Sequence, residues 1–281
     1  MKKYKLTNET IVHFGFTLYR IEALMDFSDV KTGYKGGFVQ SENNLSQLGN
    51  AWVYGNAKVY GNAKVYGNAK VYDNAKVYGD AEVYGNAFVC GYAKVYGDAK
   101  VCGNASVYGN AVVFDYAKVY NNAKVCGNAE VFCDAEVYGN AVVYFHAKVY
   151  GNAVVFDYAF VCGYAEVFDY AKVYGNAKVY GDAEVYDNAF VCGYAEVYGK
   201  AEVREDAKVY KNSDYIVFKN WWSSGRYFTW TRSNKMWKVG CFYGNGEELI
   251  KKAYADSEES GREYERVVRY VESILADELN K

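Results

Sequence analysis

Residues 51–74 read AWVYGNAKVYGNAKVYGNAKVYDN, and the same six-residue pattern continues far beyond them. Valine stands at every sixth position from Val53 to Val209, and alanine stands two places before each of these valines. The pattern forms 27 hexads without an insertion, and together they span residues 51–212. The repeat decides the fold, because each unit can bury its apolar side only by stacking on its neighbours.

A six-residue period suits neither an α-helix nor a coiled coil. Apolar positions six apart precess around a helix, and a coiled coil requires a period of seven. The period instead indicates a β-solenoid, in which lysine, valine and tyrosine form a short strand with valine pointing inward. The Gly-Asn pair makes each corner, because both residues tolerate a positive φ. Three hexads close one 18-residue triangular coil, so the 27 hexads predict nine coils, about 43 Å long.

The hexads carry an aliphatic residue at one position and a small residue four places later, and they resemble the hexapeptide-repeat family of left-handed parallel β-helices. This resemblance covers all 162 repeat residues. The resemblance implies that the solenoid winds with a left hand, whereas the usual rule for crossovers between parallel strands favours the right hand. We therefore expect a mainly β fold of about nine triangular coils, with a small N-terminal cap and a C-terminal α+β domain.

A second resemblance lies ahead of the repeat. It is to bacterial and phage-borne hexapeptide-repeat proteins that are named as acyltransferase-like and have no established activity. The resemblance rests on three short segments: Asp26–Gly33 (DFSDVKTG), Gly36–Val39 (GGFV) and Asn44–Gln47 (NLSQ). It implies a family and carries over no reaction.

The composition argues against several classes of protein. The 281 residues include no proline, where average usage would give about 14. A hydrophobic share of 51% with a formal net charge of −2 argues against a disordered chain and against a general nucleic-acid binder. There is no run of 18 apolar residues, and the first residues lack the apolar core of a signal peptide. We expect a cytoplasmic protein with no membrane partner.

The 18-residue coil divides the outward side chains into three faces. Face 1 comprises the hexads that begin at Ala51 and at every eighteenth residue after it, face 2 those from Ala57, and face 3 those from Ala63. Face 1 is the most apolar and is the candidate interface of a homo-oligomer through four outward residues: Trp52, Phe88, Val142 and Phe160. The alternative is that stacked tyrosine and valine simply suit β-ladders.

Cysteine and histidine give few candidates for catalysis or metal binding. The seven cysteines include no CxxC pair, and those that share a column on face 1 would lie about 9.6 Å apart, too far for a disulfide. We expect no disulfide framework, no metal site and no cofactor. Some β-helix enzymes are acyl-CoA transferases with a catalytic histidine at a coil corner, which makes His146 the catalytic candidate. His146 stands one place later in its hexad than that histidine, and the inserted loop of those enzymes is absent.

The two ends are expected to cap the repeat, since terminal coils expose an apolar cross-section. Residues 1–50 form the N-terminal cap, with a strand at 17–24. Residues 213–281 form a small α+β domain, with a strand at 215–218, a hairpin of 227–232 and 236–243, and helices at 246–257 and 261–279. Ser260 and Glu263 are expected to form a capping box at the start of the second helix.

A basic and aromatic segment lies in the C-terminal domain. Residues 215–246 contain five basic residues, no Asp or Glu, and four of the five tryptophans. Basic groups beside aromatic rings can hold an anionic, stackable ligand. The candidate ligand-binding residues are Trp221, Trp222, Arg226, Trp230, Arg232 and Lys235. The alternative is a tryptophan-rich core, in which case strand alternation places Arg232 at the edge of the helices and leaves Trp221 and Trp222 more exposed.

The sequence therefore predicts a non-catalytic β-solenoid, assembled as a homo-oligomer, that presents a C-terminal recognition domain. Its partner would be an anionic or nucleotide-like small molecule, or a protein. Because the second resemblance includes phage-borne proteins, host-directed sequestration of a nucleotide-like molecule is a specific version of this hypothesis. Two alternatives stay open: an acyl-CoA-dependent acyltransferase that uses His146, and a structural filament or spike component that associates through face 1.

Overall fold

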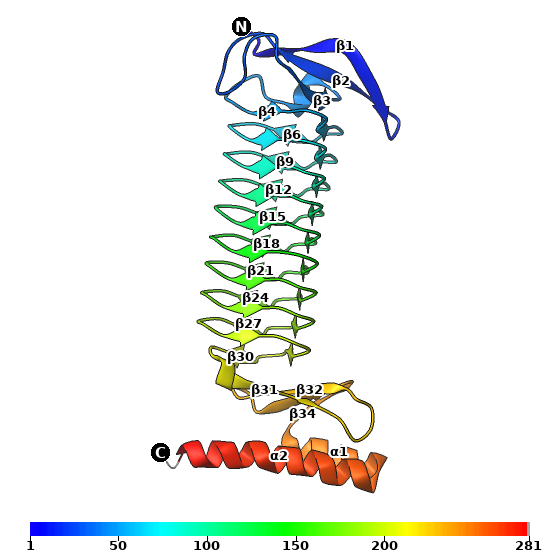
Figure 1. The fold of residues 1–281 in the computed structure, drawn as a ribbon, viewed down its shortest axis with the longest axis vertical. Coiled ribbons are helices and arrows are strands. Elements are labelled where there is room, and N and C mark those ends of the chain that lie inside the picture. The colour runs from blue at the N-terminus through cyan, green and yellow to red at the C-terminus, as the bar shows by residue number, and fades with distance from the viewer. Residues whose placement is uncertain (280–281) are drawn as a thin grey trace.

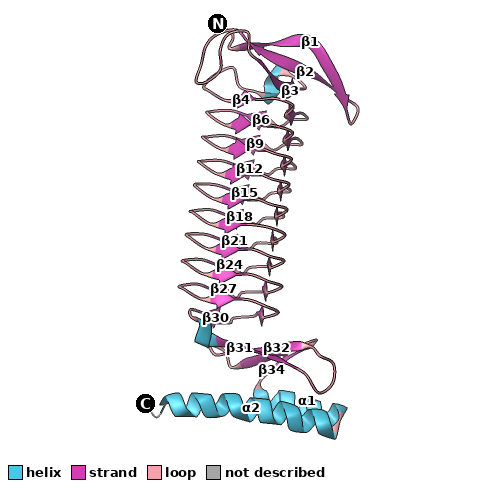
Figure 2. Ribbon diagram, viewed as in Figure 1, coloured by secondary structure: helices cyan, strands magenta, loops and turns pink. Residues whose placement is uncertain are grey.

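The computed structural model describes residues 1–279 as a rod with a folded unit at each end (Figure 1). The described part of the chain begins at one end of the rod and finishes at the other. Within the described residues, helices occur only at the C-terminal end, apart from two short 3₁₀ turns (Figure 2). The prediction of a mainly β fold, with a parallel β-solenoid and a C-terminal α+β domain, is confirmed. The hand of the solenoid stays a prediction.

Each hexad contributes one two-residue strand, and every third strand joins the same parallel sheet. Face 1 consists of β4 (Trp52–Val53), β7 (Lys70–Val71), β10 (Phe88–Val89), β13 (Ser106–Val107), β16 (Lys124–Val125), β19 (Val142–Val143), β22 (Phe160–Val161), β25 (Lys178–Val179) and β28 (Glu196–Val197). Face 2 consists of β5 (Lys58–Val59), β8 (Lys76–Val77), β11 (Lys94–Val95), β14 (Val112–Val113), β17 (Glu130–Val131), β20 (Lys148–Val149), β23 (Glu166–Val167), β26 (Glu184–Val185) and β29 (Glu202–Val203). Face 3 consists of β6 (Lys64–Val65), β9 (Glu82–Val83), β12 (Lys100–Val101), β15 (Lys118–Val119), β18 (Glu136–Val137), β21 (Val154–Val155), β24 (Lys172–Val173), β27 (Phe190–Val191) and β30 (Lys208–Val209).

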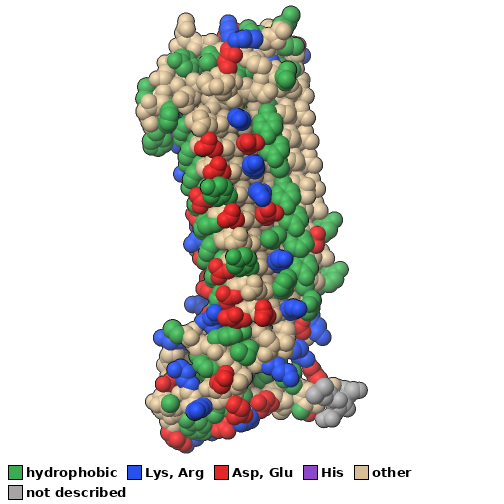
Figure 3. Space-filling view, turned by 180° about the vertical axis from the view of Figure 1, so that it is seen from behind, with side chains coloured by type: hydrophobic (Ala, Val, Ile, Leu, Met, Phe, Trp, Pro, Cys, Tyr) green, Lys and Arg blue, Asp and Glu red, His purple; other side chains and the backbone are tan. Residues whose placement is uncertain are grey.

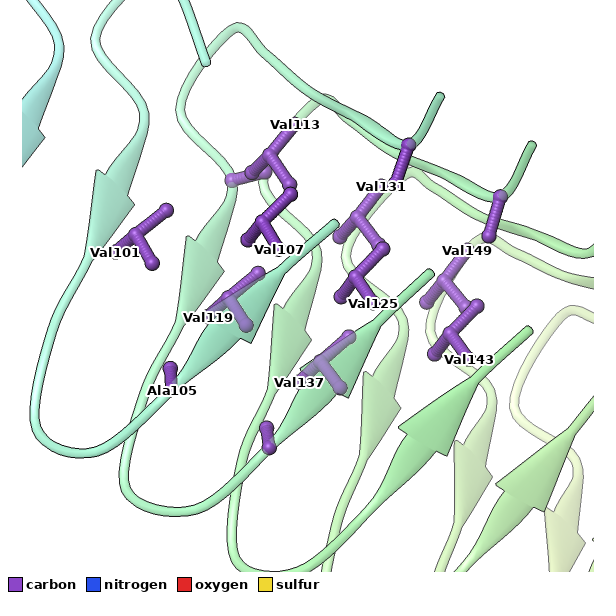
Figure 4. Packing of buried hydrophobic residues seen from close by; sticks show 14 of the residues in the cluster. Val101, Ala105, Val107, Val113, Val119, Val125, Val131, Val137, Val143 and Val149 are labelled. Atoms are coloured by element: carbon purple, nitrogen blue, oxygen red, sulfur yellow. The ribbon is translucent and has the colours of Figure 1, made fainter. Parts of the chain in front are cut away.

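The repeated valines and alanines form the interior of the rod. All of them from Ala51 to Val209 are at most 1% exposed. Valines of successive coils pair in register, as Val107 does with Val125, so that they stack in columns (Figure 4). Burial of one such side chain contributes about 1.5–3 kcal/mol, which stabilises the stack along its whole length.

The corners have the predicted backbone conformation. Gly67 has a φ of 70°, and a Cβ on it would lie 3.1 Å from the amide nitrogen of Gly85 in the next coil. Other residues take the same left-handed conformation at this corner position, among them Asp73 (φ 57°) and Phe145 (φ 67°). Asp tolerates this region better than a bulky residue does, so Phe145 is the more strained of the two.

Faces 2 and 3 combine stacked rings with charged side chains. On face 2, eight rings from Tyr60 to Tyr186 stack with centroids 4.8–5.0 Å apart. Glu166 accepts a hydrogen bond from the Tyr150 hydroxyl at 2.8 Å and pairs with Lys148 at 3.3 Å. Figure 3 shows a column of charged side chains beside a column of hydrophobic ones along the rod. Such faces are suited to contact with solvent.

The N-terminal cap extends the sheet of face 2. β1 (Tyr4–His13) and β2 (Phe16–Ala23) form an antiparallel hairpin, which confirms the predicted strand. β3 (Lys35–Val39) pairs with β2 and lies parallel to β5. After η1 (Glu42–Asn44), Leu45 forms a bridge to Val65 on face 3. β3 and Leu45 therefore begin a partial coil ahead of the nine repeat coils.

Trp52 is not exposed on face 1, contrary to the sequence-based expectation. Its side chain is fully buried, with ring centroids of the cap residues Tyr4 and Phe27 at 5.9 and 5.3 Å. A Cβ on Gly36 would lie 2.8 Å from the Trp52 ring, so glycine is needed there. The sequence repeat placed Trp52 outward correctly, but it does not show that the cap folds over the first coils of face 1.

The C-terminal domain is an antiparallel sheet covered by two helices. Its elements are η2 (Asn212–Asp214), β31 (Tyr215–Lys219), β32 (Tyr227–Thr231), β33 (Met236–Val239), β34 (Phe242–Gly244), α1 (Gly246–Asp256) and α2 (Glu258–Leu279). The hydroxyl of Thr229 accepts a hydrogen bond from the Glu202 amide of the last coil at 2.9 Å. Phe228, Trp230 and Trp237 lie in the core between sheet and helices. The predicted strand, the hairpin turn and the two helices are confirmed. The second arm predicted at 236–243 is not one strand, because a turn at Gly240 and Cys241 divides it into the antiparallel strands β33 and β34.

The predicted capping box at the start of the second helix is wrong. α2 begins at Glu258, and the hydroxyl of Ser257 accepts a hydrogen bond from the Ser260 amide at 3.0 Å. A capping box does occur one helix earlier, where Asn245 and Glu248 bond reciprocally at the start of α1. Ser257 precedes the helix and Ser260 lies in its first turn, and pattern alone did not indicate which of the two serines caps it.

Candidate functional site

The loop between β31 and β32, residues 220–226, forms the rim of a cavity in the C-terminal domain. Asn220 is buried and organises this loop. Its Nδ2 donates to the Tyr264 hydroxyl at 3.0 Å, and its Oδ1 accepts from the amide and the hydroxyl of Ser223 at 2.9 and 3.1 Å. Its backbone amide donates to the carbonyl of Arg226 at 2.7 Å, which closes the loop.

The cavity lies between this loop, the turn after β33 and the two helices, and its volume is about 330 Å³. It is lined by Asn220, Ser223, Ser224, Arg226, Val239, Cys241, Phe242, Leu249, Lys252, Ala253, Asp256, Ser260 and Tyr264. A second cavity of about 360 Å³ shares Ser224 and Arg226 with the first and reaches Lys200 and Glu202 of the last coil. We call the two cavities together the Arg226 site.

The guanidinium of Arg226 is unpaired in this site. Among residues 1–279 it makes no ion pair and no side-chain hydrogen bond. The side chain extends over Gly240, where a Cβ would lie 2.9 Å from its Nη1. Lys252 of α1 lines the same cavity and also has no ion-pair partner in the described chain, while Asp256 is the carboxylate of that cavity. The first cavity therefore has an excess of positive charge.

Tyr264 forms the inner wall of the first cavity. Burial raises the pKa of Tyr264, while the hydrogen bond from Asn220 and the charge of Arg226 oppose that rise. The phenol is therefore neutral at physiological pH. It contributes a polar oxygen and a ring face, and no charge, to the lining.

The other predicted basic residues do not join Arg226. Arg232 forms a two-pronged ion pair with Glu278 of α2 and donates to the carbonyl of Ser213 at 3.1 Å. Lys235 lies in the turn before β33 and lines a separate cavity, whose acidic residues are Glu247 and Glu272. The six candidate residues thus do not form one site. As the core alternative predicted, Arg232 lies at the edge of the helices.

The tryptophans divide between the core and the surface. Trp230 is only 3% exposed and belongs to the core, and together with Lys235 it lines the separate cavity beside α2. Trp222 packs edge-on against Tyr264 with a centroid distance of 5.0 Å, and its Nε1 is buried without a hydrogen-bond partner. Trp221 is 74% exposed. The loop that carries Arg226 therefore has one anchored indole and one exposed indole.

His146 occupies a corner of the sixth coil. Its ring stacks on Tyr164 with a centroid distance of 4.9 Å and an interplanar angle of 4°. Its Nε2 lies 3.4 Å from Nδ2 of Asn128, which stands at the same corner one coil earlier. Phe145 packs edge-on against the ring at 4.8 Å. Among residues 1–279, no carboxylate is hydrogen-bonded to the imidazole, and the catalytic role of His146 stays an untested alternative.

All seven cysteines are free thiols. Cys126 is buried beneath Tyr108, and a hydrogen bond between the two side chains raises the pKa of Tyr108 to about 12. Within residues 1–279, no three His, Cys, Asp or Glu side chains are grouped as a metal site requires.

Sequence reasoning missed Asn220, Lys252 and Lys200, which complete the Arg226 site. Lys252 and Asp256 lie one helical turn apart, so the helix period could have placed them on one side of α1. Nothing in the sequence pairs Asn220 with Tyr264, because 44 residues separate them and the contact depends on how α2 packs on the sheet.

No protein-family model matches this chain, and no curated protein matches it significantly. In the described part of the chain, no helix is both long and apolar enough to cross a membrane.

Proposed function

We propose that this protein is a non-catalytic binding protein whose Arg226 site holds a small, anionic, nucleotide-like ligand. The observation that carries the proposal is the unpaired guanidinium of Arg226, which lines two adjoining cavities. The nearby basic residues Arg232 and Lys238 are instead paired with Glu278 and Glu202. A planar guanidinium matches the geometry of phosphate and carboxylate groups, and an unpaired one is free to bind them.

The aromatic residues of the loop support a ligand with a planar part. Trp222 fixes the loop to Tyr264, and Trp221, the residue directly after Asn220, presents an exposed indole. Stacking of a base on an aromatic ring contributes about 1–3 kcal/mol. A cavity of about 330 Å³ lies at the small end of ligand sites, which favours a mononucleotide over a larger ligand.

In this proposal the rod is a rigid spacer that carries the recognition domain at its end. The domain is fixed to the last coils by Thr229, by the Lys238–Glu202 pair at 2.9 Å, and by the Tyr215 hydroxyl, which donates to the Glu196 carbonyl at 2.8 Å. The resemblance to phage-borne hexapeptide-repeat proteins supports the specific version, host-directed sequestration of a nucleotide-like molecule. The free cysteines support a reducing, cytoplasmic place of action.

Tryptophan fluorescence of the full chain tests the proposal, with AMP, ADP, ATP and inorganic phosphate as ligands. We expect a saturable change for at least one nucleotide, and a loss of affinity of about tenfold or more in Arg226→Gln, because a charged hydrogen-bond donor is removed. Arg232→Gln is the matched control and should bind as the wild type does, since Arg232 is already paired with Glu278. Equal loss in both variants, or no response to any of the four ligands, would contradict the proposal.

A further inference from the structure

The helices of the C-terminal domain border a separate cavity, whose volume is about 340 Å³. The Arg226 site lies where α1 ends and α2 begins, whereas this cavity lies between the start of α1 and the later part of α2. It shares no lining residue with the Arg226 site. We call it the Trp237 cavity, after one of its lining residues. The two sites can therefore be tested independently.

The walls of the Trp237 cavity are apolar. Trp230 and Trp237 line it from the sheet, and their ring centroids lie 6.4 Å apart. Val268, Val271 and Leu275 line it from α2. All five side chains pack in or against the core of the domain, so the cavity is set between sheet and helix. Such walls suit a small apolar ligand with an aromatic ring.

Trp237 brings an unpartnered hydrogen-bond donor to these walls. Its side chain is only 2% exposed, and within residues 1–279 its indole N–H donates to no other group. A Cβ on Gly246 would lie 3.5 Å from its Nε1, and Gly246 itself lines the cavity. Buried indole N–H groups are normally paired, because an unpaired buried donor is costly. This donor therefore favours a ligand that supplies an acceptor oxygen.

The first turn of α1 adds backbone donors at the same place. The amides of Gly246 and Glu247 stand at the helix start, where no carbonyl of the helix can accept from them. The side chain of Asn245 caps the amide of Glu248 instead, at 3.0 Å. Gly246 and Glu247 both line the cavity. Together with the N–H of Trp237, they make this end of the cavity rich in donors.

The charges at the rim balance one another. Glu247 and Glu272 both accept hydrogen bonds from Arg269, at 2.6 and 2.9 Å. Lys235 is the other charged residue of the lining. Because these cations and carboxylates cancel, a charged ligand would lose its hydration without a matching gain. An uncharged acceptor, such as a carbonyl oxygen, fits the donors at a smaller desolvation cost.

We propose that the Trp237 cavity binds a small, uncharged, aromatic molecule that carries one carbonyl group. The ring of the ligand packs between the two tryptophans and the α2 side chains Val271 and Leu275. Its carbonyl oxygen accepts from the N–H of Trp237 and from an amide at the start of α1. This ligand differs in class from a nucleotide, and the proposal does not depend on a ligand in the Arg226 site.

The indole N–H signals in NMR spectra of the full chain test the proposal, because the chain has only five tryptophans. The probes are acetophenone, benzoate and cumene, which are similar in shape and carry a carbonyl, a carboxylate and no acceptor. We expect acetophenone to shift the signals of Trp230 and Trp237 with saturation, and a Kd on the order of 1 mM or below. Benzoate and cumene should bind about tenfold or more weakly, because one loses its hydration and the other leaves the donors unpaired. Trp52, in the N-terminal cap, is the internal reference.

The variants Trp237→Phe and Trp222→Phe separate the role of the donor from that of packing. Each variant keeps an aromatic ring and loses one indole N–H, and Trp222 does not line the Trp237 cavity. Trp237→Phe should abolish the preference for acetophenone over cumene, measured on the Trp230 signal, and Trp222→Phe should retain it. A general loss of packing would weaken both probes and leave their ratio unchanged.

Several results would overturn the proposal. One is an unshifted Trp237 signal up to about 10 mM acetophenone. Others are equal or tighter binding of benzoate or cumene, an unchanged ratio in Trp237→Phe, or shifts confined to Trp221 and Trp222, which would place the ligand at the Arg226 site. The comparison of the three probes uses the wild type alone, so it decides the question even if a variant does not fold.

Discussion

The surroundings of a residue are determined differently in the rod and in the C-terminal domain. In the rod, the place of a residue within its hexad determines whether it is buried, as it does for Val131 inside and Val112 outside. In the C-terminal domain, roles depend on contacts between distant segments, such as the bond from Asn220 to Tyr264 across 44 residues. The comparison teaches that a repeat makes structure easy to infer, while the residues that we propose for ligand binding lie where the repeat ends.

The largest effect is expected from a charge placed inside the rod. Val131→Asp puts a carboxylate into an interior that offers it no partner, and we expect a loss of more than about 4 kcal/mol of stability. Val112→Asp, at an outward position of face 2, should change stability by less than about 0.5 kcal/mol. Denaturant unfolding followed by circular dichroism compares the two. Similar losses would show that position in the hexad does not control burial.

Asn220→Ala tests the corresponding claim for the C-terminal domain. The variant loses three side-chain hydrogen bonds and leaves the buried partner Tyr264 unsatisfied, so we expect a loss of about 2–3 kcal/mol in that domain. Tryptophan fluorescence reports it, because four of the five tryptophans lie in residues 215–246. In the rod, Asn86→Ala removes exposed ladder bonds to Asn68 and Asn104 and should cost less than about 1 kcal/mol. A larger loss of stability in Asn86→Ala than in Asn220→Ala would contradict this contrast between the rod and the C-terminal domain.

The same contrast explains how much could be predicted from the sequence. The coils, their three faces and the positive φ at the corners follow from a period in which each hexad has the same neighbours. The structure confirms these three features. Trp52 was the exception in the rod, because the cap that covers it lies outside the repeat. In the C-terminal domain the strands and helices were predictable from local pattern. The ion pair of Arg232 with Glu278 and the cavity that Arg226 shares with Lys252 were not, because Glu278 and Lys252 reach the sheet only through the packing of the helices.

Phe145 offers a smaller test, which concerns strain within the repeat. Its φ of 67° is unfavourable for a bulky residue, so Phe145→Gly should stabilise the rod by about 1 kcal/mol. Gly127→Ala, one coil earlier at the same corner, should destabilise it, because the new Cβ would lie 2.9 Å from the amide nitrogen of Phe145. Thermal unfolding of both variants gives the sign of each change. A stabilising Gly127→Ala would contradict the assignment of this corner.

The smallest expected effect is a pH dependence on face 2. Burial and the neighbouring Glu202 and Glu166 raise the pKa of Glu184. A raised carboxyl pKa in the folded state means that this group favours folding at low pH, and that this contribution is lost as pH rises through the folded-state pKa. Glu184→Gln should therefore be more stable than the wild type by a few tenths of a kcal/mol at pH 7, and equal to it below about pH 4. Chemical unfolding at both pH values measures the difference. A variant less stable at pH 7 would contradict the raised pKa.

The central claim is that the chemistry of this protein lies in the unpaired Arg226 at the end of a structural rod. Isothermal titration calorimetry with the nucleotide panel, on the full chain and on Arg226→Gln and Arg232→Gln, tests it most directly. The predicted result is saturable heat for one ligand per chain in the wild type and in Arg232→Gln, with a strong reduction in Arg226→Gln. No heat from any nucleotide in the wild type, or undiminished heat in Arg226→Gln, would contradict the claim.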